Sequence, residues 1–138
     1  MGCRPVAADL VIVKEGKVVL IKRAKEPFKG MWALPGGRLE ENETIEECAI
    51  REAKEETSLD IELQALIGVY SHPERDPRKV VAVAFLASPI GGTLRASTDA
   101  LEARWVEIEK ALKMELAADH NRILEDALGL YISQDSLR

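Results

Sequence analysis

The feature that most restricts the fold of this chain is an acidic segment, Glu40 to Glu56, which contains eight of the 24 Asp and Glu residues. Within it, Thr44 and Glu47 have the spacing of a capping box, in which two side chains satisfy backbone donors at a helix start. Helix-forming residues continue to about Glu56. Like charges three or four residues apart destabilise a helix unless cations or basic side chains compensate them. The sequence therefore predicts a helix whose acidic side attracts a cation.

Two faces of the predicted helix separate when its residues are placed at about 100° per position. The apolar face consists of Ile45, Ala49, Ile50 and Ala53. Glu52, Glu55 and Glu56 fall beside it, at positions whose Cβ atoms approach within about 5–6 Å. Mg²⁺ takes oxygen ligands and commonly bridges carboxylates to substrate phosphates, so we expect these three carboxylates to share a magnesium ion. The alternative is a glutamate-rich face that is merely solvated.

Arg51 and the glycines before the helix are expected to support this site. Arg51 lies one turn from both Glu47 and Glu55, so it can pair with either and orient a carboxylate. Gly36 and Gly37 permit close backbone approaches that a Cβ would block. A glycine carbonyl could therefore complete the metal shell.

Predicted strands precede and follow the helix. They comprise Val6–Val13, Lys17–Ile21, a short Trp32–Leu34, Ile61–Ser71, Val80–Ala87 and Ala103–Ile108. Residues 25–37, 72–79 and 89–99 read as loops, and residues 119–132 predict a closing amphipathic helix. Strands interspersed with helices favour an α/β/α sandwich with a central mixed β-sheet.

The order of residues from Gly37 to Leu59 resembles the Nudix box. After Gly37 come five residues, Glu43, seven residues and then Arg51-Glu52-Ala53-Lys54-Glu55-Glu56-Thr57-Ser58-Leu59. Six such matches at a given start have a chance probability of about 10⁻⁷. Ser58 departs from the family pattern, which usually has glycine at this helix end, where a left-handed residue is favoured.

The resemblance implies a Nudix-type α/β/α sandwich over residues 1–138 as a single domain, and a hydrolase that depends on Mg²⁺, for which Mn²⁺ can substitute. Its implied metal ligands are the carbonyl of Gly37 and the carboxylates of Glu52, Glu55 and Glu56. Glu43 and Arg51 would support these ligands.

The reaction expected of such a site is hydrolysis of a diphosphate linkage. Bound divalent ions polarise a phosphoryl oxygen and lower the pKa of the attacking water. A general base must take the proton of that water, and Glu55, Asp99 and Glu102 are the candidates. Glu102 is alternatively a surface acid at the start of a strand.

The loop Ser71–Lys79 is the main indication of the substrate. Arg75 and Arg78 can direct forked donors to a phosphate or to Asp76, although a solvated turn is the alternative. The loop is similar to a segment of ADP-ribose pyrophosphatases and of related ADP-ribose-sensing regulators, as is the Asp119-His120 pair. The resemblance therefore favours cleavage of ADP-ribose to AMP and ribose 5-phosphate. The alternatives are a nucleoside triphosphate pyrophosphohydrolase of the 8-oxo-dGTP type and a non-catalytic ADP-ribose sensor.

Two further residues before the helix are candidates for substrate binding. Arg23 could contact a phosphate and Phe28 could stack on adenine. Trp32 and Trp105 are expected to be core anchors, and His120 a capping or packing residue rather than a metal ligand.

The amino-acid composition restricts the kinds of binding partner and the cellular location expected for the chain. A net charge of −5 argues against binding to a nucleic acid polymer, whose phosphates require clustered Lys and Arg. Cys3 and Cys48 imply no disulfide framework, which fits a cytoplasmic protein. The longest apolar run, Val80–Ala87, is too short to span a membrane. The resemblance is compatible with a homodimer.

Overall fold

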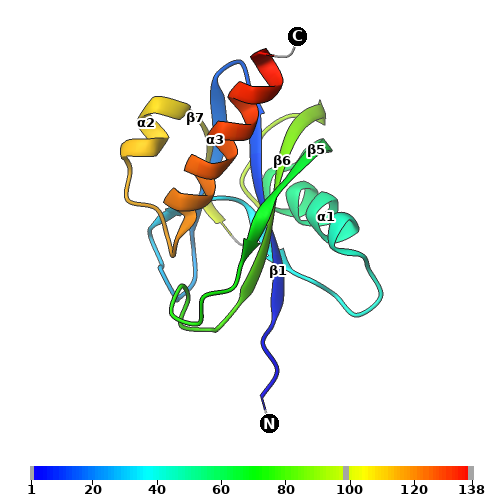
Figure 1. Cartoon of the computed structure of the whole chain (residues 1–138), viewed down its shortest axis with the longest axis vertical. Coiled ribbons are helices and arrows are strands. Elements are labelled where there is room, and N and C mark those ends of the chain that lie inside the picture. Colours follow the sequence, from blue (N-terminus) through cyan, green and yellow to red (C-terminus); the bar gives the residue numbers. More distant parts are fainter. Residues whose placement is uncertain (1, 98–99, 137–138) are drawn as a thin grey trace.

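The structure is a computed structural model that describes residues 2–97 and 100–136. Figure 1 follows the chain through all of its elements. In order they are β1 (Val6–Lys14), β2 (Lys17–Arg23), β3 (Trp32–Ala33), β4 (Gly36–Arg38), α1 (Ile45–Thr57), β5 (Leu59–Tyr70), β6 (Val81–Gly92), β7 (Ala100–Glu107), α2 (Ile108–Lys113) and α3 (His120–Ser136).

The strands form a mixed sheet centred on β1. Strand β6 runs parallel to β1 along one edge, from Val6 opposite Val81 to Ile12 opposite Ala87. The other edge of β1 is divided between β4, which pairs near Ala8, and β2, which pairs near Val13. The remaining described pairs, β2 with β3, β2 with β7 and β5 with β6, are antiparallel. The predicted mixed sheet is confirmed.

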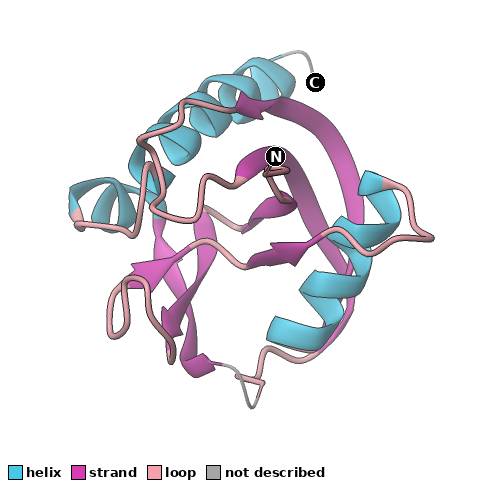
Figure 2. Ribbon diagram, turned by 90° about the horizontal axis from the view of Figure 1, so that it is seen from below, coloured by secondary structure: helices cyan, strands magenta, loops and turns pink. Residues whose placement is uncertain are grey.

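Helices cover both faces of this sheet, as Figures 1 and 2 show. Successive residues of a strand point to opposite faces. Leu10 and Ile12 accordingly pack in the apolar cluster under α1, whereas Val11 and Val13 pack in the cluster under α2 and α3. The predicted α/β/α sandwich is therefore correct, and β1 is its central strand.

Three elements differ from the sequence-based expectation. Gly36–Arg38 is a short strand rather than loop, because its backbone pairs with β1 although its two glycines carry no side-chain pattern. Strand β6 continues through Pro89 to Gly92, where it remains paired with β5. Helix α2 was missed because its six residues are too few for an apolar period to emerge.

The buried face of α1 also differs from the predicted apolar face. Ile50 is 44% exposed, whereas Cys48 is fully buried beside Ala49 and Ala53. Ile50 lies roughly 100° around the helix from Ala49, so a buried face centred on Cys48 and Ala49 leaves it outside. The capping box at Thr44 and Glu47 is confirmed by both of its hydrogen bonds.

The end of α1 has the left-handed residue that its position demands. Ser58 adopts φ +67°, and its N–H donates to the carbonyl of Lys54. The buried hydroxyl of Thr57 donates to the carbonyl of Ala53 and accepts from the N–H of Leu59. The two hydrogen bonds of the Thr57 side chain thus stabilise this turn, in which a glycine would adopt the left-handed conformation at a lower cost.

No helix within the described ranges combines the length and apolar character that crossing a bilayer requires.

Candidate functional site

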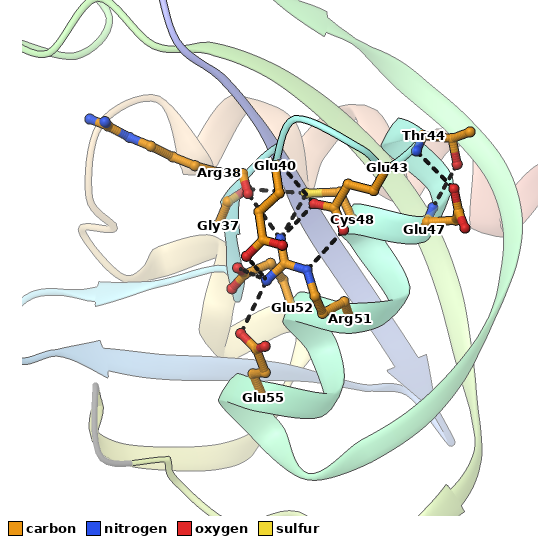
Figure 3. A network of polar contacts seen from close by, with 10 residues as sticks. All are labelled: Gly37, Arg38, Glu40, Glu43, Thr44, Glu47, Cys48, Arg51, Glu52 and Glu55. Atoms are coloured by element: carbon orange, nitrogen blue, oxygen red, sulfur yellow. Dashed lines mark hydrogen bonds and ion pairs between the residues drawn. The ribbon is translucent and has the colours of Figure 1, made fainter.

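Arg51, in the middle of α1, joins the acidic side chains of the site (Figure 3). Its Nη1 atom lies 2.7 Å from Glu52 Oε1 and 3.1 Å from Glu55 Oε2. Its Nε and Nη2 atoms donate to the two oxygens of Glu43, at 2.9 and 2.6 Å, and Nη2 also donates to the carbonyl of Arg38. One guanidinium therefore fixes three carboxylates, and we call these four side chains the Arg51 cluster.

Glu43 anchors the Arg51 cluster to the chain that precedes the helix. Its Oε1 atom also accepts from the N–H of Glu40. The hydrogen bonds from Arg51 lower the pKa of Glu43 to about 2, so this carboxylate remains charged. Glu47, one of the two partners expected for Arg51, is not in the cluster because its carboxylate is used by the helix cap.

Gly37 brings its backbone against the carboxylate of Glu52. A Cβ on residue 37 would stand 2.2 Å from Glu52 Cδ, closer than any real Cβ contact. The carbonyl of Gly37 faces α1, where Cys48 Sγ donates to it at 3.6 Å. The close approach predicted for the glycine pair is thus observed, and it places the carboxylate of Glu52 against the backbone of Gly37.

Glu56 is not among the carboxylates that Arg51 binds, and it meets the glycine pair at Gly36. Its Oε1 atom accepts from the N–H of Gly36 at 3.1 Å. Burial raises the pKa of Glu56 to about 8. The carboxylate lines a cavity of about 140 Å³, here called the Glu56 cavity, whose lining includes Asp9, Arg23, Arg78 and His120.

The expected convergence of three glutamates is not found in this structure. Within residues 2–97 and 100–136, no group of three or more acidic, His or Cys side chains is arranged to hold a metal ion. Glu52 and Glu55 do share a cation, but that cation is the guanidinium of Arg51.

The donor set nevertheless fits Mg²⁺ in its chemistry. Carboxylate and carbonyl oxygens are the ligands this ion prefers. The Arg51 guanidinium is a stand-in cation that pairs with two of the three glutamates. The side chain of Glu55 is 60% exposed and can therefore turn from Arg51 toward an ion. Glu52 is already held against the backbone of Gly37.

The two arginines of the 72–79 loop have different environments. Arg75 is buried, with its side chain 4% exposed, and forks onto Asp119 at 2.9 and 2.6 Å. Arg78 forks onto Asp76 at 3.0 and 2.7 Å, as the sequence suggested, and its side chain is 36% exposed beside the Glu56 cavity. Both arginines line the Glu56 cavity, but the side chain of Arg78 is the more exposed of the two.

Arg23 and Phe28 lie on the segment that leads from β2 to β3. Arg23 lines the Glu56 cavity, and its Nε atom donates to the carbonyl of Pro27. Phe28 is half-buried against a small apolar cluster that contains Ile21 and Ala33. Arg23 is thus brought to Glu56, whereas Phe28 serves at least partly in packing.

Glu102 lies on β7 and forms an ion pair with Arg104 at 2.7 Å. The guanidinium of Arg104 in turn stacks over Trp32, 5.6 Å from the ring centre. Trp32 and Trp105 are partly buried against the two main apolar clusters, as expected of core anchors. Asp99, the other acid considered as a base, lies outside the described residues.

Asp9 is a buried acid that sequence reasoning missed. It is 8% exposed, lines the Glu56 cavity and lies within the apolar strand β1. Its charge among the apolar residues of the segment Val6–Val13 was the available signal. His120 is a packing residue, as expected, and its Nδ1 atom accepts from the N–H of Leu34.

The acidic helix α1 packs against the Gly-Gly strand β4 on an α/β/α sheet, and the NUDIX domain model matches residues 4–127, which include both elements. The chain belongs to the Nudix hydrolase family. It is 48% identical over 122 residues to the ADP-ribose pyrophosphatase of Methanocaldococcus jannaschii, covering 88% of this chain and 71% of that protein.

Two further relatives bear on the substrate. The 8-oxo-dGDP phosphatase NUDT18 of Homo sapiens is 41% identical over 104 residues, which is 72% of this chain but 31% of that protein. The NUDIX domain of Shewanella oneidensis NrtR, crystallised with ADP ribose, superposes with a TM-score of 0.83 at 26% identity, covering 95% of this chain and 90% of that one.

Proposed function

We propose that this Nudix hydrolase requires Mg²⁺, or Mn²⁺ in its place, and cleaves the diphosphate linkage of ADP-ribose to AMP and ribose 5-phosphate. The observation that carries the hydrolytic part is the Arg51 cluster, in which one guanidinium binds Glu52 and Glu55 and Glu52 lies against the backbone of Gly37. We further propose that residues 1–138 act as a single domain.

The proposed metal ligands are the carbonyl of Gly37 and the carboxylates of Glu52, Glu55 and Glu56. When bound, the ion supplies a Lewis acid for the phosphoryl oxygen and lowers the pKa of the attacking water. Binding requires Glu55 to leave Arg51. Arg51 would remain in place through its two hydrogen bonds to Glu43, and so keep Glu52 oriented.

We assign the general base to Glu55. Its carboxylate is the most exposed of the Arg51 cluster and carries one hydrogen bond, from Arg51 Nη1. An Oε atom that turns away from Arg51 is therefore available to accept a proton from water. Glu102 on β7 is the second candidate, and its carboxylate is already paired with Arg104.

The substrate assignment is supported by the Glu56 cavity and by the relatives. Arg23 and Arg78 line this cavity beside Glu56, and positively charged guanidinium groups suit phosphate oxygens. The relative with 48% identity is named an ADP-ribose pyrophosphatase. The diphosphate of ADP-ribose would lie between these arginines and the glutamates of α1.

Product analysis tests the substrate. The chain is incubated with Mg²⁺ and equal concentrations of ADP-ribose, 8-oxo-dGDP or 8-oxo-dGTP, and the products are separated by chromatography. We expect AMP and ribose 5-phosphate in equal amounts, with kcat/KM highest for ADP-ribose. A higher kcat/KM for 8-oxo-dGDP would instead support the function named for the human relative.

The same panel separates an enzyme from a sensor. A sensor would bind ADP-ribose, measured by calorimetry, and leave it intact in the presence of Mg²⁺. We expect turnover because the four proposed ligands are all present in the chain. Binding without product from any substrate would overturn the proposed function.

A further inference from the structure

Asp9 places a carboxylate inside the fold at a point where three segments meet. Its Oδ2 atom lies 3.6 Å from His120 Nε2 and 4.0 Å from Arg75 Nη2. Burial is the main cause that raises the pKa of Asp9, and the neighbouring His120 and Arg75 oppose it. Burial of a carboxylate costs free energy of folding unless polar partners compensate it. His120 and Arg75 are therefore needed to keep Asp9 in this position.

The hydrogen bond to Leu34 fixes the state of His120. Because Nδ1 accepts from the N–H of Leu34 at 3.0 Å, the proton of the neutral ring resides on Nε2. That proton faces Asp9 Oδ2. Burial also lowers the pKa of His120, which favours the neutral ring. The imidazole therefore connects the backbone of Leu34 to the carboxylate of Asp9.

The segment from Trp32 to Gly37 is held at successive backbone groups by different parts of the fold. The carbonyl of Trp32 accepts from Ala117 N, and the carbonyl of Pro35 accepts from Leu10 N. The N–H groups of Leu34 and Gly36 donate to His120 and Glu56. This segment is thus fixed immediately before the carbonyl of Gly37.

The side chain of Asp9 also packs directly against the backbone of this segment, at Gly36. A Cβ on Gly36 would stand 2.6 Å from Asp9 Oδ1 and 2.2 Å from the carbonyl of Ala8. The backbone of Gly36 therefore rests on the Asp9 side chain on one face, while its N–H meets Glu56. A change in the position of Asp9 would move the glycine pair that faces α1.

Arg75 connects the 72–79 loop to the same point. Besides its fork onto Asp119, it donates to the carbonyl of Val80 at 3.1 Å. Asp119 directly precedes His120 at the start of α3. The loop that carries Asp76 and Arg78 to the Glu56 cavity is therefore tied to the residues that hold Leu34.

We propose that Asp9, Arg75, Asp119 and His120 form a positioning unit that sets the affinity of the metal site by holding the Leu34–Gly37 segment in place. None of the four is a proposed metal ligand. They act through the backbone of Gly36, whose N–H donates to Glu56, and of Gly37, which lies against Glu52. This inference rests on the proposed metal-dependent function.

Two substitutions of His120 separate its two contacts. His120→Asn places an amide oxygen near the position of Nδ1 and retains an acceptor for the N–H of Leu34. His120→Gln reaches the position of Nε2 and loses that acceptor. Mn²⁺ binding is measured without substrate, from the electron paramagnetic resonance signal of the free ion, together with kcat, KM and the melting temperature.

Removal of groups that orient metal ligands typically weakens binding about 10- to 100-fold. We expect His120→Gln to weaken Mn²⁺ binding about tenfold and to raise the half-saturating Mg²⁺ concentration in parallel, with KM for ADP-ribose at saturating Mg²⁺ changed less than twofold. His120→Asn should remain within about threefold of wild type in Mn²⁺ binding. Equal Mn²⁺ affinity in both variants would overturn the proposal.

Asp119→Asn and Tyr70→Phe complete the test. Asp119→Asn weakens the fork from Arg75 without a change of size and should weaken Mn²⁺ binding even if His120→Gln does not fold. Tyr70→Phe removes a 2.6 Å hydrogen bond between β5 and Asp126 of α3, in which no residue of the positioning unit takes part, and should leave Mn²⁺ binding unchanged. If Tyr70→Phe weakened Mn²⁺ binding as much as Asp119→Asn, the effect would come from the packing of α3 in general, and the proposal would be overturned.

Failure of the proposed function gives a different result. A wild-type chain that binds Mn²⁺ and hydrolyses no substrate would refute the enzyme, while the order of Mn²⁺ affinities among the variants would still test the positioning unit. A wild-type chain that binds no Mn²⁺ would refute both.

Discussion

The carboxylate of Glu52 lies so close to the backbone of Gly37 that a Cβ at position 37 would stand 2.2 Å from Glu52 Cδ. Strand β4 and helix α1 contribute one residue each to this contact. The absence of a side chain at residue 37 is therefore what lets the carbonyl of Gly37 and the carboxylate of Glu52 belong to one site.

Gly37→Ala should consequently displace Glu52 and abolish most Mg²⁺-dependent hydrolysis. We expect kcat/KM to fall at least about 100-fold and Mn²⁺ affinity to fall with it, because two ligands move apart. Gly129→Ala is the matched control, since nothing lies within 4 Å of a Cβ at that position in α3. It should keep full activity and raise stability by about 0.5–1 kcal/mol, through the better helix propensity of alanine. Equal activity of the two variants would show that the Gly37 contact is not needed.

The low pKa of Glu43 predicts a dependence of stability on pH. Its pKa is about 2 in the folded chain, against an ordinary value of 4.5, because Arg51 hydrogen-bonds to its charged form. The charge of Glu43 therefore stabilises the fold above pH 4.5, and this contribution is lost as the pH falls from 4.5 to about 2. Urea denaturation of wild type and Glu43→Gln should differ most at neutral pH and converge toward pH 2. A difference that stays constant with pH would mean that Glu43 acts through its shape alone.

Sequence alone predicted those parts of the site that are local in the chain. The capping box gave the start of α1, and the spacing of Glu52 and Glu55 gave their proximity, because both depend only on helix geometry. The separation of Glu56 was not predictable, since it depends on the N–H of Gly36, which only the pairing of β4 with β1 presents. Asp9 and His120 lie far apart in sequence, so only the tertiary packing of α3 on the sheet brings them together.

Glu55, proposed both as a metal ligand and as the general base, gives a third prediction. Its side chain is largely exposed, and it contributes one contact to Arg51, which retains Glu43 and Glu52. Glu55→Gln should therefore lower kcat by at least about 100-fold, the usual size of a general-base contribution, and change the melting temperature by less than about 2 °C. Glu46→Gln neutralises the same charge in the first turn of the same helix and should retain activity. If Glu102→Gln lost kcat instead and Glu55→Gln did not, the base would lie on β7.

The ion pair between Arg78 and Asp76 leads to a prediction that Arg78 contributes to the affinity for substrate. Asp76 is 3% exposed and accepts two hydrogen bonds from the guanidinium of Arg78, as well as one from its backbone N–H. Arg78→Lys keeps the positive charge beside the Glu56 cavity and loses the fork, which a lysine cannot reproduce. We expect KM for ADP-ribose to rise about tenfold with kcat changed less than threefold, whereas Arg122→Lys on the exposed surface of α3 should change neither. Steady-state kinetics at saturating Mg²⁺ measures both constants, and an unchanged KM in Arg78→Lys would remove Arg78 from the substrate site.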